Sequence, residues 1–572
     1  MGGGALFLLG FGGGRSLLAG PLGGGDLLPA YATADIWSAG TPFGNTHLGF
    51  PIGMDLRYYP TTDVFQNLVA GVITRLSGNP FAGVNMMFAL SFPLTAVVAY
   101  YVLRSAGFRG PMAIAAAWGL MAIPYHWKRL PHVYLGSMYS AVLGVGLALW
   151  VGSGGLERMV KSRRRALKLA VLLGAIVLVA GSGIYYAAFT VILVMAAVAF
   201  RFARGLHWRR AVVDLLPAVA VAVATAAFLA PAALFVHGHP TSQPVAARLP
   251  VQSVAYSGVL AYAILPAPES MVPGWSPVNA WVERAVVAGQ QIPTSGVIWD
   301  ADFGSVFTVA ALLVCLVGVV VVGRRGPRVR VEPRVSGALV TWLSAVVLLF
   351  FVPWGLNFLF AAAVSPQLRG WDRLVPVLFT LVTVGGGIAW RYLRWPSHGV
   401  WAAMIAVCVV VLVVFDTVLP QRAWFRESAR SPIAVAAAGR EYATALNSAI
   451  PQNCGVLELP RISYPEEPPV NGLDGYEHLW PALTNPGKSW SFGAMKWSSA
   501  DDWQRSVPDP LDGPGVDMLV KAGFCAVHVD YRGFAPANVE MERQHFAALL
   551  GNPVATGFGG VWSAYRLRNS AS

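Results

Sequence analysis

Ten long apolar runs constrain the fold of this sequence more than any other feature. A helix that crosses a bilayer needs about 20 mostly apolar residues. The runs lie at residues 81–105, 110–127, 134–153, 167–182, 184–201, 210–236, 303–323, 336–353, 374–392 and 399–420. Residues 1–25 are Gly-rich and form a weaker candidate for a first span, with a cleaved signal peptide as the alternative. The pattern predicts an α-helical polytopic membrane protein with about 11 transmembrane helices.

The composition excludes the main soluble classes. Charged residues make up 12% of the 572 residues and hydrophobic residues 55%, whereas a soluble domain has about 25% charged residues. A soluble enzyme, a disordered chain and a disulfide-rich secreted module are therefore ruled out. The formal net charge of +13 does not indicate nucleic-acid binding, because the cytoplasmic loops of membrane proteins carry an excess of Lys and Arg.

The basic residues also predict the orientation in the membrane. They gather in the linkers 154–168, 201–210 and 324–334, and in two further turns that hold Arg104, Arg109, Arg391 and Arg394. A topology of eleven spans with an inside N-terminus puts all five turns in the cytoplasm. The loops 26–80 and 237–302 then lie outside. Within the first loop, residues 64–78 are amphipathic and too short to span, which predicts an interfacial helix.

The composition changes after residue 420, where short apolar runs alternate with polar ones. Residues 455–460, 524–531 and 561–568 favour strands, and residues 431–449 and 536–550 favour helices. We therefore expect two domains: a transmembrane domain over 1–420 and an extracytoplasmic α/β domain over 421–572. Cys454 and Cys525 lie on candidate strands in an oxidising compartment, which predicts a disulfide between them.

Three groups of polar residues lie at the predicted outer boundary. Asp26 ends the first span, where a carboxylate can reach a water-borne substrate and act as a base. Residues 126–132 and 368–373 place cations on the outer side, against the usual bias, where Lys and Arg suit a phosphate. Each group also has a purely structural explanation. Asp26 could be a solvated acid at a helix end, the cations of residues 126–132 could snorkel to lipid headgroups, and residues 368–373 could hold an internal Arg–Asp pair.

Several motifs follow one another along nearly the whole chain. They are Gly25-Asp26, LGFPIGMDLRYYPTTDVFQ at 48–66, FPLTAVVAYYVLR at 92–104, PYHWKRLPHVYL at 124–135, GSGIYYAAF at 181–189, RLPVQSVAY at 248–256, LRGWDR at 368–373, SWSFGAMKW at 489–497 and GFCAVHVDYRGF at 523–534. In this order they resemble a branch of the bacterial GT-C-like integral membrane glycosyltransferases. The paired acidic signature that is common elsewhere in that superfamily is absent here.

The resemblance implies an enzyme that takes a sugar from a polyprenyl-phosphate donor on the outer face of the bacterial cytoplasmic membrane. It implies Asp26 as the base, and it matches Asp55 and Asp63 to acidic positions suited to the acceptor or a cation. The positions that match its basic residues are Arg129, His132, Arg248, Arg369 and Arg373. No cofactor is specified by the sequence, and a divalent cation, Mg²⁺ or Mn²⁺, is left open.

The residues and the resemblance together predict a glycosyltransferase that works by inverting displacement. Asp26 would deprotonate an acceptor hydroxyl, with Asp35 as a second candidate nine residues further on. Lys128, Arg129 or Arg369 would hold the leaving phosphate. The acceptor is left open as a glycan, a lipid or a protein. A lipid-linked sugar flippase or transporter and a non-catalytic envelope assembly protein are the alternatives.

Overall fold

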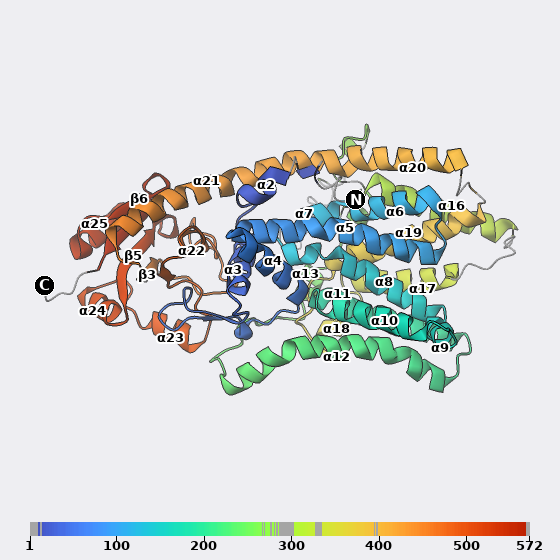
Figure 1. Cartoon of the computed structure of the whole chain (residues 1–572), viewed down its shortest axis with the longest axis horizontal. Helices are drawn as coiled ribbons and strands as arrows, with labels where there is room; N and C mark the ends of the chain where they lie inside the picture. Colours follow the sequence, from blue (N-terminus) through green and yellow to red (C-terminus); the bar gives the residue numbers. More distant parts are fainter. Residues whose placement is uncertain are drawn as a thin grey trace.

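A computed structural model shows two parts, a helical bundle and a smaller domain with a sheet at one end of it (Figure 1). The structure describes residues 14–265, 267, 269–274, 303–325, 335–393, 395, 399–452 and 454–567, with isolated positions in 8–11 and 277–284. Most of the first 13 residues and of 275–302 lie outside the described residues. The predicted first span over 1–25 is therefore described only in part, by α2 (Gly14–Ala19) and the short η1 (Gly25–Leu27).

Each of the ten apolar runs contains a helix. They are α5 (Pro80–Ala106), α6 (Gly110–Met121), α8 (Met138–Gly152), α10 (Arg165–Ala180), α11 (Ile184–Ala203), α12 (Trp208–Gly238), α16 (Val306–Arg325), α17 (Gly337–Phe351), α19 (Val375–Tyr392) and α20 (Gly399–Val413). By length and composition, five helices in the described part can cross a membrane, or six if the pair α17 and α18 (Leu356–Ala363), bent by 66°, is one span. The chain is thus a multi-pass membrane protein, while the count of eleven spans stays a prediction.

The short helix α4 (Val64–Ser77) occupies the segment predicted to lie in the membrane interface. Its polar side is buried, with Gln66 5%, Asn67 1% and Thr74 3% exposed. Its apolar side faces outward, with Val72 49% and Leu76 83% exposed. An outward apolar face is stable in lipid and costly in water, so the structure agrees with an interfacial position.

The C-terminal domain contains a five-stranded mixed sheet in the order β4-β3-β5-β7-β6. Its strands are β3 (Gly455–Leu459), β4 (Ser489–Trp490), β5 (Phe524–Asp530), β6 (Ala555–Gly557) and β7 (Trp562–Arg566). Strands β4, β3 and β5 are parallel, and β7 and β6 continue antiparallel. The helices of this domain are α22 (Leu479–Thr484), α23 (Ser499–Arg505), α24 (Gly513–Lys521) and α25 (Val539–Leu550). The three strands and the helix near 536–550 agree with the sequence prediction.

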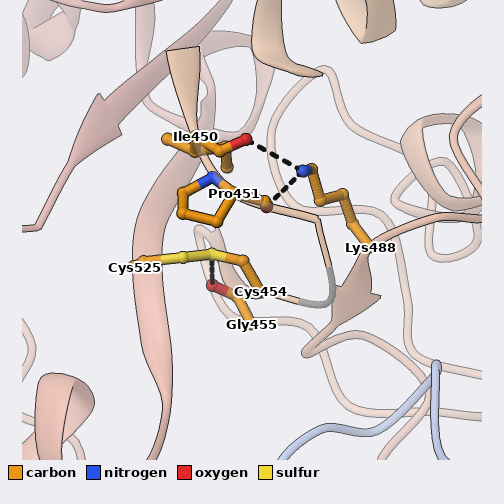
Figure 2. Close-up of a disulfide and its surroundings, with 6 residues drawn as sticks. All are labelled: Ile450, Pro451, Cys454, Gly455, Lys488 and Cys525. Carbon is orange, nitrogen blue, oxygen red and sulfur yellow. Dashed lines mark hydrogen bonds between the residues drawn. A yellow bond between two sulfur atoms is a disulfide. The ribbon is translucent and has the colours of Figure 1, made fainter. Parts of the chain in front are cut away.

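The predicted disulfide between Cys454 and Cys525 is present (Figure 2). Cys454 directly precedes β3, and Cys525 lies in the neighbouring strand β5. Their Cα atoms are 6.0 Å apart, within the usual range of about 4.4–6.8 Å for a bridge. The bridge therefore joins two adjacent strands at the start of the sheet.

A continuous helix joins the two parts of the molecule. Helix α20, a π-helical turn at Val414–Val418 and α21 (Leu419–Ala449) form one run of 51 residues over Gly399–Ala449, which crosses from the bundle to the sheet domain along one edge of the molecule (Figure 1). The boundary expected at residue 420 falls inside this helix. The predicted helix over 431–449 is its last part.

The first outer loop is built into the C-terminal sheet domain. After α3 (Leu28–Ser38) it forms a small hairpin, β1 (Gly44–Asn45) and β2 (Met54–Asp55). The backbone of residues 47–50 then pairs with β4: Trp490 N donates to His47 O at 2.7 Å, and Phe50 N donates to Trp490 O at 3.0 Å. One hydrophobic core runs from α3 and α5 into the sheet domain through Phe81, Trp480 and Trp490. The outer loop and the C-terminal domain therefore form a single layer over the bundle.

Candidate active site

A pocket of about 260 Å³ lies where this outer layer meets the bundle. Its polar lining includes four residues that the sequence singled out: Asp26, Asp63, His132 and Arg373. They come from four segments: η1, the turn before α4, the turn before η3 (Val133–Gly136), and η4 (Asp372–Leu374). The fold thus brings together an acid, a second acid, an imidazole and a guanidinium that are up to about 350 residues apart in the sequence.

Asp26 is the accessible acid of this pocket. Gly25 adopts φ +55°, a left-handed conformation that favours glycine, and this turn directs the chain from α2 into η1. The Asp26 side chain is 51% exposed, and its Oδ2 lies 3.1 Å from Nε2 of His132. A water-borne substrate can therefore reach the carboxylate of Asp26, and His132 orients this carboxylate.

Asp63 is the half-buried acid. It directly precedes α4, and it accepts a hydrogen bond from the Thr61 hydroxyl. Burial raises the pKa of Asp63 to about 6, against smaller opposing effects of Thr61 and of the Arg373 charge. A Cβ at Gly183, which has φ +118°, would lie 3.2 Å from Asp63 Oδ1, so glycine at this position leaves room beside the carboxylate.

Arg373 is the cation of the pocket. Its guanidinium carbon lies 3.9 Å from the centre of the Tyr185 ring, which holds the flat group over the aromatic face. Its Nε is buried and has no hydrogen-bond partner in the described part of the chain. A donor that is buried without an acceptor is costly. Because Arg373 lines the pocket, its positive charge attracts an anion there.

The other predicted phosphate ligands contact carboxylates instead. Lys128 Nζ lies 2.8 Å from Glu269, Arg129 Nη2 lies 2.7 Å from Asp372, and Arg248 Nη2 lies 2.5 Å from Glu466. None of these cations, nor Arg369, lines the pocket. Each cation has an acidic partner close by, which lowers its attraction for a phosphate. The pair within LRGWDR that sequence offered as an alternative is also not formed, because Asp372 contacts Arg129.

Glu466 is a residue of this region that the sequence analysis missed. It comes from the C-terminal domain, with its backbone at φ +59°. Its Oε1 accepts a hydrogen bond from Tyr59 at 2.6 Å and from Arg248 at 2.5 Å, and Arg369 lies 3.9 Å away. Burial alone would raise the pKa of Glu466, but the bonds from Arg248 and Tyr59 outweigh it and hold the pKa below its ordinary value. The one available signal was an acidic pair between prolines, PEEPP at 465–469.

Asp35 and Asp55 lie away from the pocket. Asp35, on α3, lines a separate cavity of about 350 Å³ together with His47 and Arg440. Burial raises the pKa of Asp35, and the nearby His47 offsets part of this rise. Asp55 forms an ion pair with Arg57 at 2.6 Å. Asp26 and Asp35 therefore line two different cavities, although both belong to the predicted outer loop 26–80.

The described residues offer no complete metal site of their own. No group of three or more His, Cys, Asp and Glu side chains among them is placed to hold a metal ion. Asp26 and Asp63 both line the pocket and supply the oxygen ligands that Mg²⁺ and Mn²⁺ prefer. Donor phosphate oxygens would have to complete such a site, so the cation requirement stays a prediction.

No family model and no curated protein matches the sequence, but solved structures match the fold. ArnT from Cupriavidus metallidurans, in a crystal structure bound to undecaprenyl phosphate, aligns over 99% of this chain and 97% of its own, with 13% identity and a TM-score of 0.52. This chain has the GT-C fold. A second match is the arabinofuranosyltransferase AftD from Mycobacteria, with 14% identity, a TM-score of 0.46, and coverage of 98% of this chain and 41% of that one. The GT-C likeness extends over the bundle and the C-terminal domain alike.

Proposed function

We propose that this protein transfers a sugar from a polyprenyl-phosphate donor to an acceptor hydroxyl at the pocket of Asp26, Asp63, His132 and Arg373. The observation that carries the proposal is this pocket, which joins an accessible carboxylate to a guanidinium that has an unsatisfied donor. The GT-C fold and the undecaprenyl phosphate in the ArnT structure support the choice of donor.

The proposed reaction is a single displacement with inversion. The acceptor oxygen forms a bond to the anomeric carbon of the donor while the bond from that carbon to the phosphate oxygen breaks. Asp26 takes the proton of the acceptor hydroxyl, because it is the exposed acid of the pocket and is oriented by His132. Arg373 stabilises the charge that develops on the leaving polyprenyl phosphate.

Asp63 has a different role in this scheme. With a pKa of about 6, it is partly protonated near neutral pH, and a neutral carboxyl group both donates and accepts hydrogen bonds. It is therefore suited to bind a sugar hydroxyl, or to share a divalent cation with Asp26 and the donor phosphate. Removal of divalent cations with a chelator distinguishes these two roles, because only the second loses activity.

The test is transfer by the purified protein from a panel of radiolabelled polyprenyl-phosphate sugars. Asp26→Asn keeps the size of the side chain and removes the base, so turnover should fall by about 10²–10⁴. Asp35→Asn is the matched control, since Asp35 is an acid of the same outer region in another cavity. Transfer that survives Asp26→Asn and is abolished by Asp35→Asn would move the base to Asp35. Movement of the lipid-linked sugar across vesicles without transfer would favour the flippase alternative.

A further inference from the structure

Two cavities meet at the opposite end of the bundle, remote from the C-terminal domain, where α9 (Gly155–Val160) and the start of α10 lie (Figure 1). The larger is a groove of about 800 Å³, a size typical of ligand sites. Helices α5, α8, α9 and α10 line it, and α8 packs against both α5 and α10. Its wall is mostly apolar, and two of its members, Tyr101 and Val171, are 68% and 65% exposed.

The second cavity is a basic hollow of about 550 Å³. Arg158, Arg201 and Arg204 line it, with Glu157 as the acid in its wall. Glu157 is already bound by Lys161 and Arg210, each at 3.1 Å. Ser153 and Arg158 line both cavities, so the hollow adjoins the mouth of the groove.

The cations at this junction differ in their partners. Arg201 contacts Asp214, and Arg158 donates to the Ser153 carbonyl. Lys168, in the groove, and Arg204, in the hollow, have no carboxylate within 4.0 Å among the described residues. The junction therefore combines an apolar channel with a positively charged end, which is complementary to an amphiphile with a negatively charged head.

We propose that these two cavities form a site for an anionic phospholipid of the cytoplasmic leaflet. The acyl chains lie in the groove between α5 and α10, and the phosphate lies at the junction of the two cavities, between Lys168 of the groove and Arg204 of the hollow. The positive-inside orientation places this end at the cytoplasmic surface, where anionic lipids attract basic residues. A polyprenyl-phosphate donor in its reacting position has its phosphate at the outer pocket, so it is not the expected occupant. The inference does not depend on the proposed transfer reaction.

The experiment is a titration of the delipidated full-length protein in detergent micelles, with bound lipid counted by native mass spectrometry. The probes are palmitoyl-oleoyl phosphatidylglycerol, the phosphatidylcholine with the same chains, and undecaprenyl phosphate. We expect phosphatidylglycerol to bind most tightly. The double variant Lys168→Gln/Arg204→Gln should weaken it by roughly 25-fold, because each cation near an anionic headgroup contributes a factor of about five.

The matched control is Arg163→Gln/Arg209→Gln, which removes the same charge at the same end but outside both cavities. It should leave phosphatidylglycerol binding within about twofold of the wild type. Equal losses in the two double variants, or equal affinity for the two phospholipids, would overturn the site. Tighter binding of undecaprenyl phosphate would overturn the choice of occupant. Val171→Trp fills the groove without changing charge and should lower phosphatidylglycerol binding as well; unchanged binding in this variant would also contradict the proposal.

Discussion

Cations at the two ends of the bundle are balanced in different ways. At the end that carries the C-terminal domain, the predicted outer end, Lys128, Arg129 and Arg248 each contact a carboxylate from a distant part of the chain. At the predicted inner end Arg201 is likewise paired with Asp214, but Lys168 and Arg204 have no carboxylate within 4.0 Å in the described part of the chain. A basic residue on the outer side is therefore not by itself a sign of a phosphate site. Arg373, with its unsatisfied Nε, is the outer cation that most resembles those of the inner end.

The largest loss of stability is expected when the buried pair of Arg129 and Asp372 is broken. The side chains of this pair are 4% and 6% exposed. Asp372→Ala leaves a buried guanidinium without its carboxylate, so we expect a loss of about 3–5 kcal/mol in stability. This loss of stability is measured as a lower midpoint of thermal unfolding in detergent. Replacing both partners, by Arg129→Met with Asp372→Leu, should recover most of the loss. The exposed pair of Glu427 and Arg430 provides the control, because Glu427→Ala should change the midpoint little.

Arg373 tests the outer site itself. Arg373→Gln should lower transfer by roughly tenfold or more, because a charge-assisted hydrogen bond contributes about 1.5–3 kcal/mol. The unfolding midpoint should hardly change, since no carboxylate loses its partner in this variant. Arg369→Gln is the companion measurement: if it costs more activity than Arg373→Gln does, the donor phosphate lies at Arg369 instead.

The raised pKa of Asp63 predicts that the stability of the folded protein depends on pH. Its pKa is about 6 in the folded protein against an ordinary 3.8, so the folded state binds more protons than the unfolded state between these values. Asp63 therefore makes its full contribution to the free energy of unfolding below about pH 3.8, and this contribution is lost as the pH rises through 6. Asp63→Asn should be more stable than the wild type by about 1–2 kcal/mol at pH 8 and equal to it near pH 4. Asp502→Asn, at an exposed acid, should show no such dependence in the same unfolding measurements.

The smallest effect concerns Glu466. Glu466→Gln removes the carboxylate that binds Arg248 and lies near Arg369, and it should cost about 1 kcal/mol of stability. Inhibition of transfer by free polyprenyl phosphate should stay the same if Arg373 is the anchor. Stronger inhibition in this variant would show that the two released arginines bind the phosphate. Glu467→Gln, which removes the neighbouring pair with Lys496, is the matched control.

Local features of the sequence predicted local features of the fold. The apolar runs became helices, and the segments at 455–460 and 524–531 became β3 and β5, because periodicity and composition act over a few neighbouring residues. The disulfide also followed, since Cys454 and Cys525 flank or lie in adjacent strands. For the site, Asp26, Asp63, His132 and Arg373 were all on the list of candidates.

Long-range pairing could not be predicted in the same way. The partners of Lys128 and Arg248 lie 141 and 218 residues away along the chain, and neither periodicity nor charge selects Glu269 or Glu466 among the other acids. The predicted boundary at 420 lies inside the continuous helix Gly399–Ala449. The change of composition after residue 420 marks where the helix becomes more polar and not where it ends, since α21 continues from Leu419 to Ala449.

The continuous helix over Gly399–Ala449 connects the bundle to the sheet domain without a loop. At 1.5 Å per residue it is about 75 Å long, more than twice the thickness of the hydrocarbon core of a bilayer. Its membrane end and its outer end must therefore tilt together, except where the π-helical turn allows bending. Since the sheet domain also shares one hydrophobic core with α3 and α5, the height of this domain above the lipid, and with it the distance at which an acceptor would meet the pocket, follows the tilt of the bundle and this helix together. Bilayer thickness, which changes the tilt of a span, would act on that distance directly.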